Sequence, residues 1–363
     1  MKYISIISAA LILMIAATKT KAQGCVAIRS NGNSCTFGNP EAAKGWQMNF
    51  NNRYFKSYKH FVGSVEQKER EENATEVINH TYSLDITATR HFNARWSIGM
   101  TLPLISNTRS SLYEHGGNSG GPSARHNTRS FGIGDMRVSV YRWLFNPAKN
   151  FKGNIQAGIG IKLPTGDYQY QDYFYKADGS VVLGPVDQSI QLGDGGTGFS
   201  LELNGYYQFN HQFGMYGNFY YLINPREQNG VSTARGGTPN ATAIKYFTNT
   251  MSVPDQYMIR GGASYMTGKF SFTGGIRMEA IPSSDFIGGD KGFRRPGFVT
   301  SFEPVFSYQA KKATFYLSVP VAIERNRTKS YSDKLRSADT GTDIHGDAAF
   351  ADYAITAGLS FRL

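Results

Sequence analysis

Eight charged residues occupy polar positions within stretches whose alternate positions are apolar. They are Asp85, Lys162, Glu202, Arg260, Arg277, Glu279, Glu303 and Glu324. Charged side chains of both signs that share one face can select solutes if they line an aqueous path. They can equally pair with one another and brace a narrow wall. The sequence leaves both interpretations open, as selectivity residues of a lumen or as an internal ion-pair network.

The histidines, serines and acidic residues do not have the arrangement of a catalytic centre. A serine hydrolase needs a serine, a histidine and a polar group that orients the histidine, but the seven histidines fall mostly in turns and loops. The stretches 343–347 and 193–196 are typical of ordinary loops, not of metal sites. No helix is predicted after Gly132-x-Gly134-Asp135, so this is not a nucleotide-binding loop. We therefore expect no enzyme activity, no metal and no cofactor.

The elements that carry the eight charges are strands. Met136, Val138 and Val140 alternate with Arg137 and Ser139, and a short turn at 146–149 leads into a second alternating run, 155–163. Side chains on a strand point alternately to its two faces, so each run has one apolar and one small or polar face. About twelve such runs follow one another from Trp46 onward, joined alternately by short turns and long polar loops.

This layout predicts an all-β, transmembrane antiparallel β-barrel of about twelve strands over residues 45–363. An even strand number, short periplasmic turns and long extracellular loops are typical of outer-membrane barrels. The sheet must close because lipid leaves no partner for an open strand edge. Charges are expected inside, since on the lipid face each costs about 2–4 kcal/mol near the midplane. A soluble β-sandwich or propeller would not explain the regular alternation of long and short connections.

The N-terminus has the pattern of a signal peptide. Lys2 precedes an apolar run from Tyr3 to Ala17, and Thr20 and Ala22 are the small residues before the expected cleavage site. We predict a signal peptide over residues 1–22 and export to the outer membrane. The run is too short for a membrane helix, and no later segment is apolar over a membrane length.

Residues 23–44 are predicted to form an N-terminal plug or a periplasmic segment. Cys25 and Cys35 are the 2 cysteines of the chain, and in an oxidising compartment we expect them to form a disulfide. The alternative is a lipid-modified Cys25, which would leave Cys35 without a partner. An unstructured periplasmic tail is the alternative to the plug.

The net charge is positive, and its distribution bears on the partners. Removing three lysines with the signal peptide leaves 35 basic against 27 acidic residues. The basic residues are scattered over loops, which argues against a nucleic-acid partner. In an exported protein, the excess favours contact with anionic lipid headgroups or anionic solutes. They include Arg109, Arg125, Arg129, Arg226, Arg235, Arg294, Arg295, Arg325, Arg327 and Lys329.

Three glycine-rich stretches carry a family resemblance. They are Gly132-Ile133-Gly134-Asp135, the run Gly158-Ile-Gly-Ile-Lys-Leu-Pro-Thr-Gly-Asp167, and Leu192-Gly-Asp-Gly-Gly-Thr-Gly198. The middle third of the chain thereby resembles outer-membrane channels named for the meta-pathway of phenol degradation, which are distantly like the fatty-acid transporter barrels. The resemblance implies a channel fold and a role in transport. The cysteine pair and the ending Phe361-Arg362-Leu363 depart from the family pattern.

Two functions are consistent with these features. The first is an outer-membrane channel for passive uptake or efflux of small organic solutes, hydrophobic or anionic. The second is a non-conducting structural or accessory barrel, which binds an envelope protein partner through its loops. A small barrel packed with side chains would conduct nothing.

Overall fold

The computed structural model describes residues 44–363. The predicted signal peptide, the Cys25–Cys35 disulfide and, apart from Lys44, the predicted plug at 23–44 lie outside these residues.

The described chain consists mainly of strands. The strands are β1 (Gly45–Val62), β2 (Val65–Glu66), β3 (Ile78–His91), β4 (Trp96–Ser111), β5 (His126–Ile133), β6 (Arg137–Trp143), β7 (Gly153–Lys162), β8 (Gln171–Tyr175), β9 (Val181–Pro185), β10 (Gly198–Gln208), β11 (Phe213–Ile223), β12 (Gln228–Ser232), β13 (Thr250–Ser252), β14 (Gln256–Thr267), β15 (Phe270–Ile281), β16 (Gly297–Gln309), β17 (Ala313–Ser318), β18 (Val321–Arg327) and β19 (Ala348–Arg362). The helices are α2 (Glu69–Glu72), α3 (Ala241–Lys245) and α4 (Tyr331–Thr340), with short 3-10 turns η1 (Asn118–Gly120), η2 (Pro122–Ala124) and η3 (Gln188–Ile190).

The wall is a closed antiparallel barrel of 12 strands, as predicted. Neighbours along the chain pair with each other, and β19 closes the ring by pairing with β1 from Gln47↔Arg362 to Phe61↔Ala348. Two wall strands are interrupted. β5 and β6 both pair with β4, and β17 and β18 both pair with β16. The closed ring leaves neither β1 nor β19 with a free edge, as a membrane requires.

The exposure of successive side chains along a strand distinguishes the outer face of the wall from the inner face. Leu201 and Leu203 are each 48% exposed, whereas Glu202 between them is 3% exposed. Ile276 and Arg277 differ in the same way, at 47% and 7%. Apolar side chains therefore cover the outer face and polar side chains fill the inner face, which suits a bilayer outside and an aqueous or hydrogen-bonded interior.

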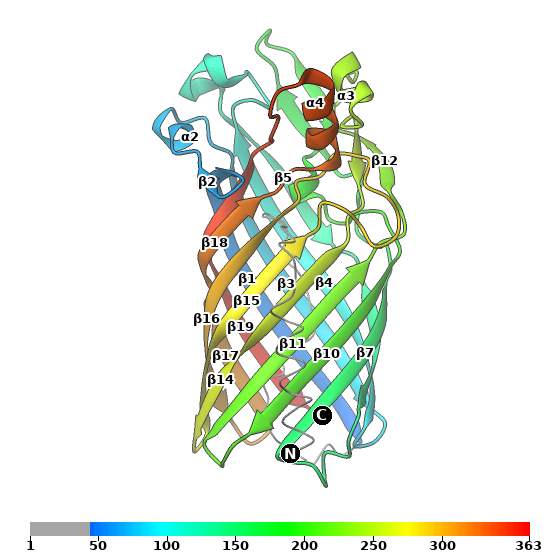
Figure 1. Cartoon of the computed structure of the whole chain (residues 1–363), viewed down its shortest axis with the longest axis vertical. Coiled ribbons are helices and arrows are strands. Elements are labelled where there is room, and N and C mark those ends of the chain that lie inside the picture. Colours follow the sequence, from blue (N-terminus) through cyan, green and yellow to red (C-terminus); the bar gives the residue numbers. More distant parts are fainter. Residues whose placement is uncertain (1–43) are drawn as a thin grey trace.

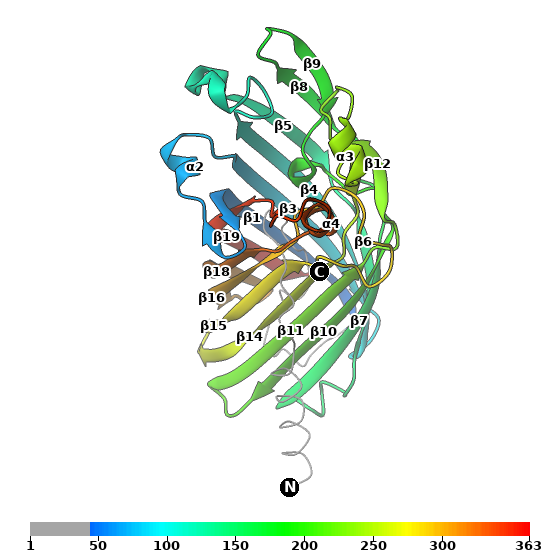
Figure 2. The ribbon, with the colours of Figure 1, turned by 45° about the horizontal axis from the view of Figure 1, so that its top comes forward.

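The connections fall at opposite ends of the barrel. Figure 1 shows tight turns at the lower rim, with the C-terminus nearby, and long loops bearing α2, α3, α4 and β12 at the upper rim. Seen with the upper rim turned forward, the β8–β9 hairpin projects furthest from the wall (Figure 2). The predicted separation of short turns and long loops to opposite ends of the barrel is confirmed. Within residues 44–363, no helix has the length and apolar character to cross a bilayer.

Candidate functional site: the lumen and the outer vestibule

Four of the predicted inner charges form one ion-pair network on neighbouring strands. Arg277 on β15 bonds to Glu303 on β16 at 3.1 Å and to Glu279 at 2.8 Å. Arg260 on β14 lies 3.6 Å from Glu303 and donates to Asn218 on β11 at 2.8 Å. The four charged residues are largely buried, and each has a close partner of opposite charge. Such pairing offsets part of the cost of burying a charge. The four side chains therefore form a connected set of ion pairs on the inner wall.

The same network reaches across the interior. Arg53 on β1 donates to both carboxylate oxygens of Glu279, at 3.1 and 3.0 Å. β1 and β15 are not neighbours, because β16, the interrupted strand β17/β18 and β19 lie between them. The pair therefore forms a chord through the lumen and narrows it at this level.

Three other predicted inner charges are also buried. Glu202 accepts a hydrogen bond from the Tyr141 hydroxyl at 3.0 Å. Lys162 is 2% exposed and contacts the carboxylate of Asp194, and Asp85 is 8% exposed on β3. Their positions agree with the predicted inward orientation.

The predicted inward orientation of Glu324 was wrong. β18 pairs with β16 through a register shift, in which Glu324 stands opposite Thr300 but Ala322 stands opposite Ser301. Ile323 is the extra residue of this bulge and is 60% exposed, and Glu324 is exposed as well. A bulge shifts the alternation by one residue, so the period of two no longer predicts the face beyond it.

Residues 186–196, which we call the inward segment, fold back from the β8–β9 hairpin into the barrel. Arg295 donates to both oxygens of Asp187 at 2.8 and 2.7 Å, and Arg109 lies 3.4 Å from the same carboxylate. Asn107 donates to the carbonyl of Ile190 at 3.2 Å. Ile190 is fully buried although its neighbours in the loop are polar. The segment is therefore anchored to the inner wall and reduces the open cross-section.

Glycines allow the inward segment to approach the wall. A side chain at Gly193 would meet the Asp135 carboxylate at 2.5 Å and the Gly166 carbonyl at 2.8 Å. A side chain at Gly166 would meet the Leu192 carbonyl at 2.5 Å. These positions belong to two of the glycine-rich stretches noted in the sequence, which thus share one contact.

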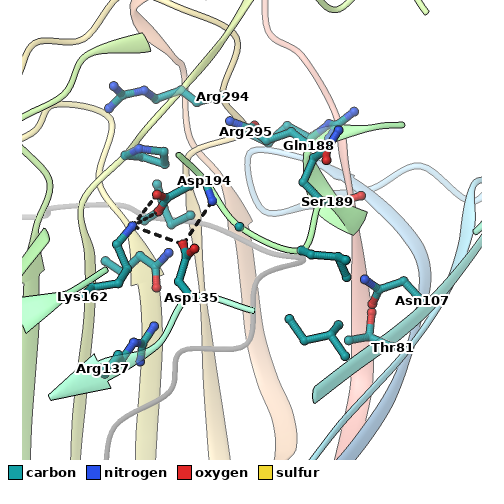
Figure 3. A pocket seen from close by; sticks show the side chains of 17 residues that line it. Thr81, Asn107, Asp135, Arg137, Lys162, Gln188, Ser189, Asp194, Arg294 and Arg295 are labelled. Atoms are coloured by element: carbon teal, nitrogen blue, oxygen red, sulfur yellow. Dashed lines mark hydrogen bonds and ion pairs between the residues drawn. The ribbon is translucent and has the colours of Figure 1, made fainter. Parts of the chain in front are cut away.

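Lys162 holds the end of the inward segment. Its ammonium group contacts Asp194 of the segment and lies 3.6 Å from Asp135 in the short connection between β5 and β6 (Figure 3). Asp135 in turn accepts from the backbone N–H of Gly166 at 3.0 Å and of Asp194 at 3.2 Å. A cavity of about 130 Å³ adjoins this cluster, and Gln188, Arg294 and Arg295 line its other side.

A larger cavity of about 700 Å³, the outer vestibule, lies on the long-loop side of the inward segment. Gln188, Arg294 and Arg295 line both cavities, so the two are adjacent. Residues of α3 and α4 contribute to the vestibule wall, and so do seven arginines and three aspartates. They are Arg70, Arg109, Arg235, Arg294, Arg295, Arg327, Arg336, Asp187, Asp333 and Asp347.

Each vestibule aspartate already has a cationic partner. Burial by itself raises the pKa of Asp187, but the guanidinium groups of Arg109 and Arg295 outweigh it and hold that pKa well below its usual range. Burial also raises the pKa of Asp347, but bonding to His60 and the charge of Arg70 bring it to about 2. These carboxylates therefore stay ionised and paired at neutral pH.

The vestibule was not predicted from the sequence. Arg109, Arg235, Arg294, Arg295 and Arg327 were recognised as loop cations but are scattered along the chain. The fold brings all five to one cavity: Arg109 and Arg327 lie at the ends of strands β4 and β18, not in loops as expected, and the other three lie in loops. Within residues 44–363, no group of three or more His, Cys, Asp or Glu side chains could hold a metal ion.

The fold is that of a transmembrane outer-membrane barrel, and the predicted likeness to outer-membrane channels is confirmed at this level. The sequence matches no family model, and no curated protein matches it. Among solved structures, the chain is similar to an outer membrane channel from Pseudomonas putida F1, with 10% identity, a TM-score of 0.56, and coverage of 90% of this chain and 100% of that chain.

Two further structures match with lower TM-scores. The translocator domain of the autotransporter NalP from Neisseria meningitidis is 10% identical, covers 89% of this chain and 90% of its own, and has a TM-score of 0.44. The toluene transporter TbuX of Ralstonia pickettii is 11% identical, covers 89% and 91%, and has a TM-score of 0.41. At 10% identity, the likeness to the channel from Pseudomonas putida F1 concerns the fold alone.

Proposed function

We propose that the protein is a passive outer-membrane channel for small organic solutes. The observation that carries the proposal is that two cavities adjoin each other between the long loops and the barrel interior. The outer vestibule adjoins a smaller cavity at the inward segment, through the shared lining residues Gln188, Arg294 and Arg295. A polar interior with ionised side chains lies below, as in water-filled barrels.

In this proposal the inner charges select among solutes. Arg260, Arg277, Glu279 and Glu303 present both signs to the lumen at the level where Arg53 crosses it. Fixed charges at a narrow point discriminate by solute charge and size. Export by a signal peptide over residues 1–22, and closure of Cys25 with Cys35 in the segment before the barrel, belong to the same proposal.

The test is conductance of the purified barrel in planar lipid bilayers, with liposome swelling for neutral solutes. We expect ion conductance in the unmodified protein. Asp194→Asn removes one carboxylate that holds Lys162, so the inward segment should loosen and the conductance should rise. Asp178→Asn, in the exposed turn between β8 and β9, is the matched control. A barrel that stays closed to ions and solutes in all three forms would contradict the proposal.

The alternative is a non-conducting barrel that binds an envelope protein through its loops. The Arg53–Glu279 chord and the inward segment favour it, because both occupy the lumen. The same recordings separate the two functions, since only the channel carries current.

A further inference from the structure

The outer vestibule carries more positive charge than its own carboxylates neutralise. The seven arginines face three aspartates in the lining, an excess of four positive charges. Two more carboxylates pair with lining arginines without lining the cavity. Glu114 lies 2.9 Å from Arg109, and Asp285 lies 2.8 Å from Arg294. An excess of two positive charges remains, and enclosed cationic cavities concentrate anions.

The vestibule lining also contains hydrogen-bond donors that nothing in the described chain satisfies. The Nε atoms of Arg294, Arg327 and Arg336 are buried and without a partner among residues 44–363, as is the hydroxyl of Ser332. Arg294, Arg327 and Ser332 are 2–3% exposed. Buried polar groups are normally bonded, and groups left over in a cavity point to a bound solute or water.

Arg336 on α4 is the cation with most freedom to bind. No described carboxylate forms an ion pair with it, whereas the other six lining arginines each have one. Its guanidinium instead lies 5.4 Å from the ring centre of Tyr246. A guanidinium is always charged and offers a planar fork that fits a carboxylate.

The lining is not uniformly polar. Arg235 lies over the Tyr113 ring at 4.9 Å, and Arg295 lies over the Phe293 ring at 4.7 Å. Val186 and Met251 add buried apolar surface. A site that combines arginines with aromatic and aliphatic groups recognises both a charge and an apolar body.

We propose that the outer vestibule is a binding site for organic anions, with the carboxylate held by Arg336 and its arginine neighbours and the apolar body packed beside Tyr113 and Phe293. The proposal rests on the channel function and specifies its solute class. The vestibule concentrates such anions at the mouth of the pathway, from which they pass toward the inward segment.

The experiment uses the full barrel in detergent, with sodium benzoate as the probe and isothermal titration calorimetry as the measurement. Benzyl alcohol is the neutral analogue, and inorganic phosphate is the anion without an apolar body. We expect saturable benzoate binding and none for benzyl alcohol. Arg336→Gln should weaken binding about tenfold, the effect of about 1.4 kcal/mol. The benzoate affinity of Arg336→Lys should lie between that of Arg336→Gln and that of the unmodified protein. Arg142→Gln, at the short-turn rim, should bind benzoate like the unmodified protein.

The outcomes are separable from those of the conductance test. Absence of benzoate binding, or equal weakening by Arg336→Gln and Arg142→Gln, overturns the vestibule site even if the barrel conducts. Phosphate binding as tight as benzoate binding overturns the assignment to organic anions. Benzoate binding by a barrel that carries no current would support the site and contradict the channel.

Discussion

Arg53 and Glu279 form a bidentate ion pair inside the barrel, although three wall strands separate β1 from β15. Most of the other inner charges pair with neighbours on the same part of the wall. This pair joins two parts of the wall that three strands separate. The two side chains therefore cross part of the lumen at the height of the charged network.

Replacing Arg53 by Gln should widen this level and weaken the barrel. Hydrogen bonds to charged groups contribute about 1.5–3 kcal/mol. The free energy of unfolding should therefore decrease by an amount in that range. Conductance should increase, because the chord no longer blocks part of the lumen. Urea unfolding in lipid vesicles and single-channel recording measure the two effects. Glu72→Gln changes an exposed residue of α2, outside the barrel wall, and should alter neither. A narrower or unchanged channel in Arg53→Gln would argue against the chord as a constriction.

Gly193→Ala should displace the inward segment. The added methyl group would lie 2.5 Å from Asp135 and 2.8 Å from the Gly166 carbonyl, which is backbone and cannot rotate away. We expect a larger conductance and faster protease cleavage within 186–196. Gly205→Ala is the control, because its methyl group would meet nothing closer than 3.8 Å. Identical behaviour of the two variants would show that the close approach at Gly193 does not hold the segment.

Asp347→Asn should produce a stability difference that depends on pH. The pKa of Asp347 lies at about 2, below its ordinary value of 3.8. A carboxyl whose pKa is lowered by folding stabilises the protein above its unfolded pKa, and this contribution is lost as the pH falls through the folded pKa. The unmodified protein should therefore have the higher melting temperature from pH 5 to 7, and the difference should disappear between about pH 4 and 2. Thermal melts across this range measure it, and a constant difference would contradict the assignment.

Asp339→Asn should loosen the contact between two extracellular helices. Asp339 on α4 lies 2.5 Å from Lys245 on α3 and also accepts from the Tyr246 hydroxyl. Exposed ion pairs contribute only about 0.2–1 kcal/mol, so global stability should barely change. Amide hydrogen exchange in 241–246 and 331–340 should become faster. Asp343→Asn, which removes another exposed carboxylate of the same loop, should leave exchange in 241–246 unchanged.

The wall was predictable because its cause is local. Alternation of Leu201, Glu202 and Leu203 follows from the strand itself, and seven of the eight charges that the same rule assigns to the inner face have buried or largely buried side chains. Glu324 escaped the rule because one extra residue, Ile323, shifts the face. The amino-acid composition of β18 does not predict the bulge.

The site was less predictable because distant loops build it. Asp187, Arg109 and Arg295 meet in one cluster, yet they come from three separate parts of the chain. The sequence does contain one signal for the inward segment. Ile190 and Leu192 are apolar residues in a polar loop, which indicates that the loop returns to the interior, and the structure buries both. The glycines at 166 and 193 were noted as a pattern, and the structure supplies their contact.

The closure of β19 against β1 has a consequence for biogenesis. These strands lie at opposite ends of the described chain, so the pairing that completes the ring is the least local one among residues 44–363. Until β19 arrives, β1 exposes unpaired backbone beside apolar side chains, the combination most prone to aggregate. We therefore expect the unfolded chain to need protection from other chains until β19 pairs with β1.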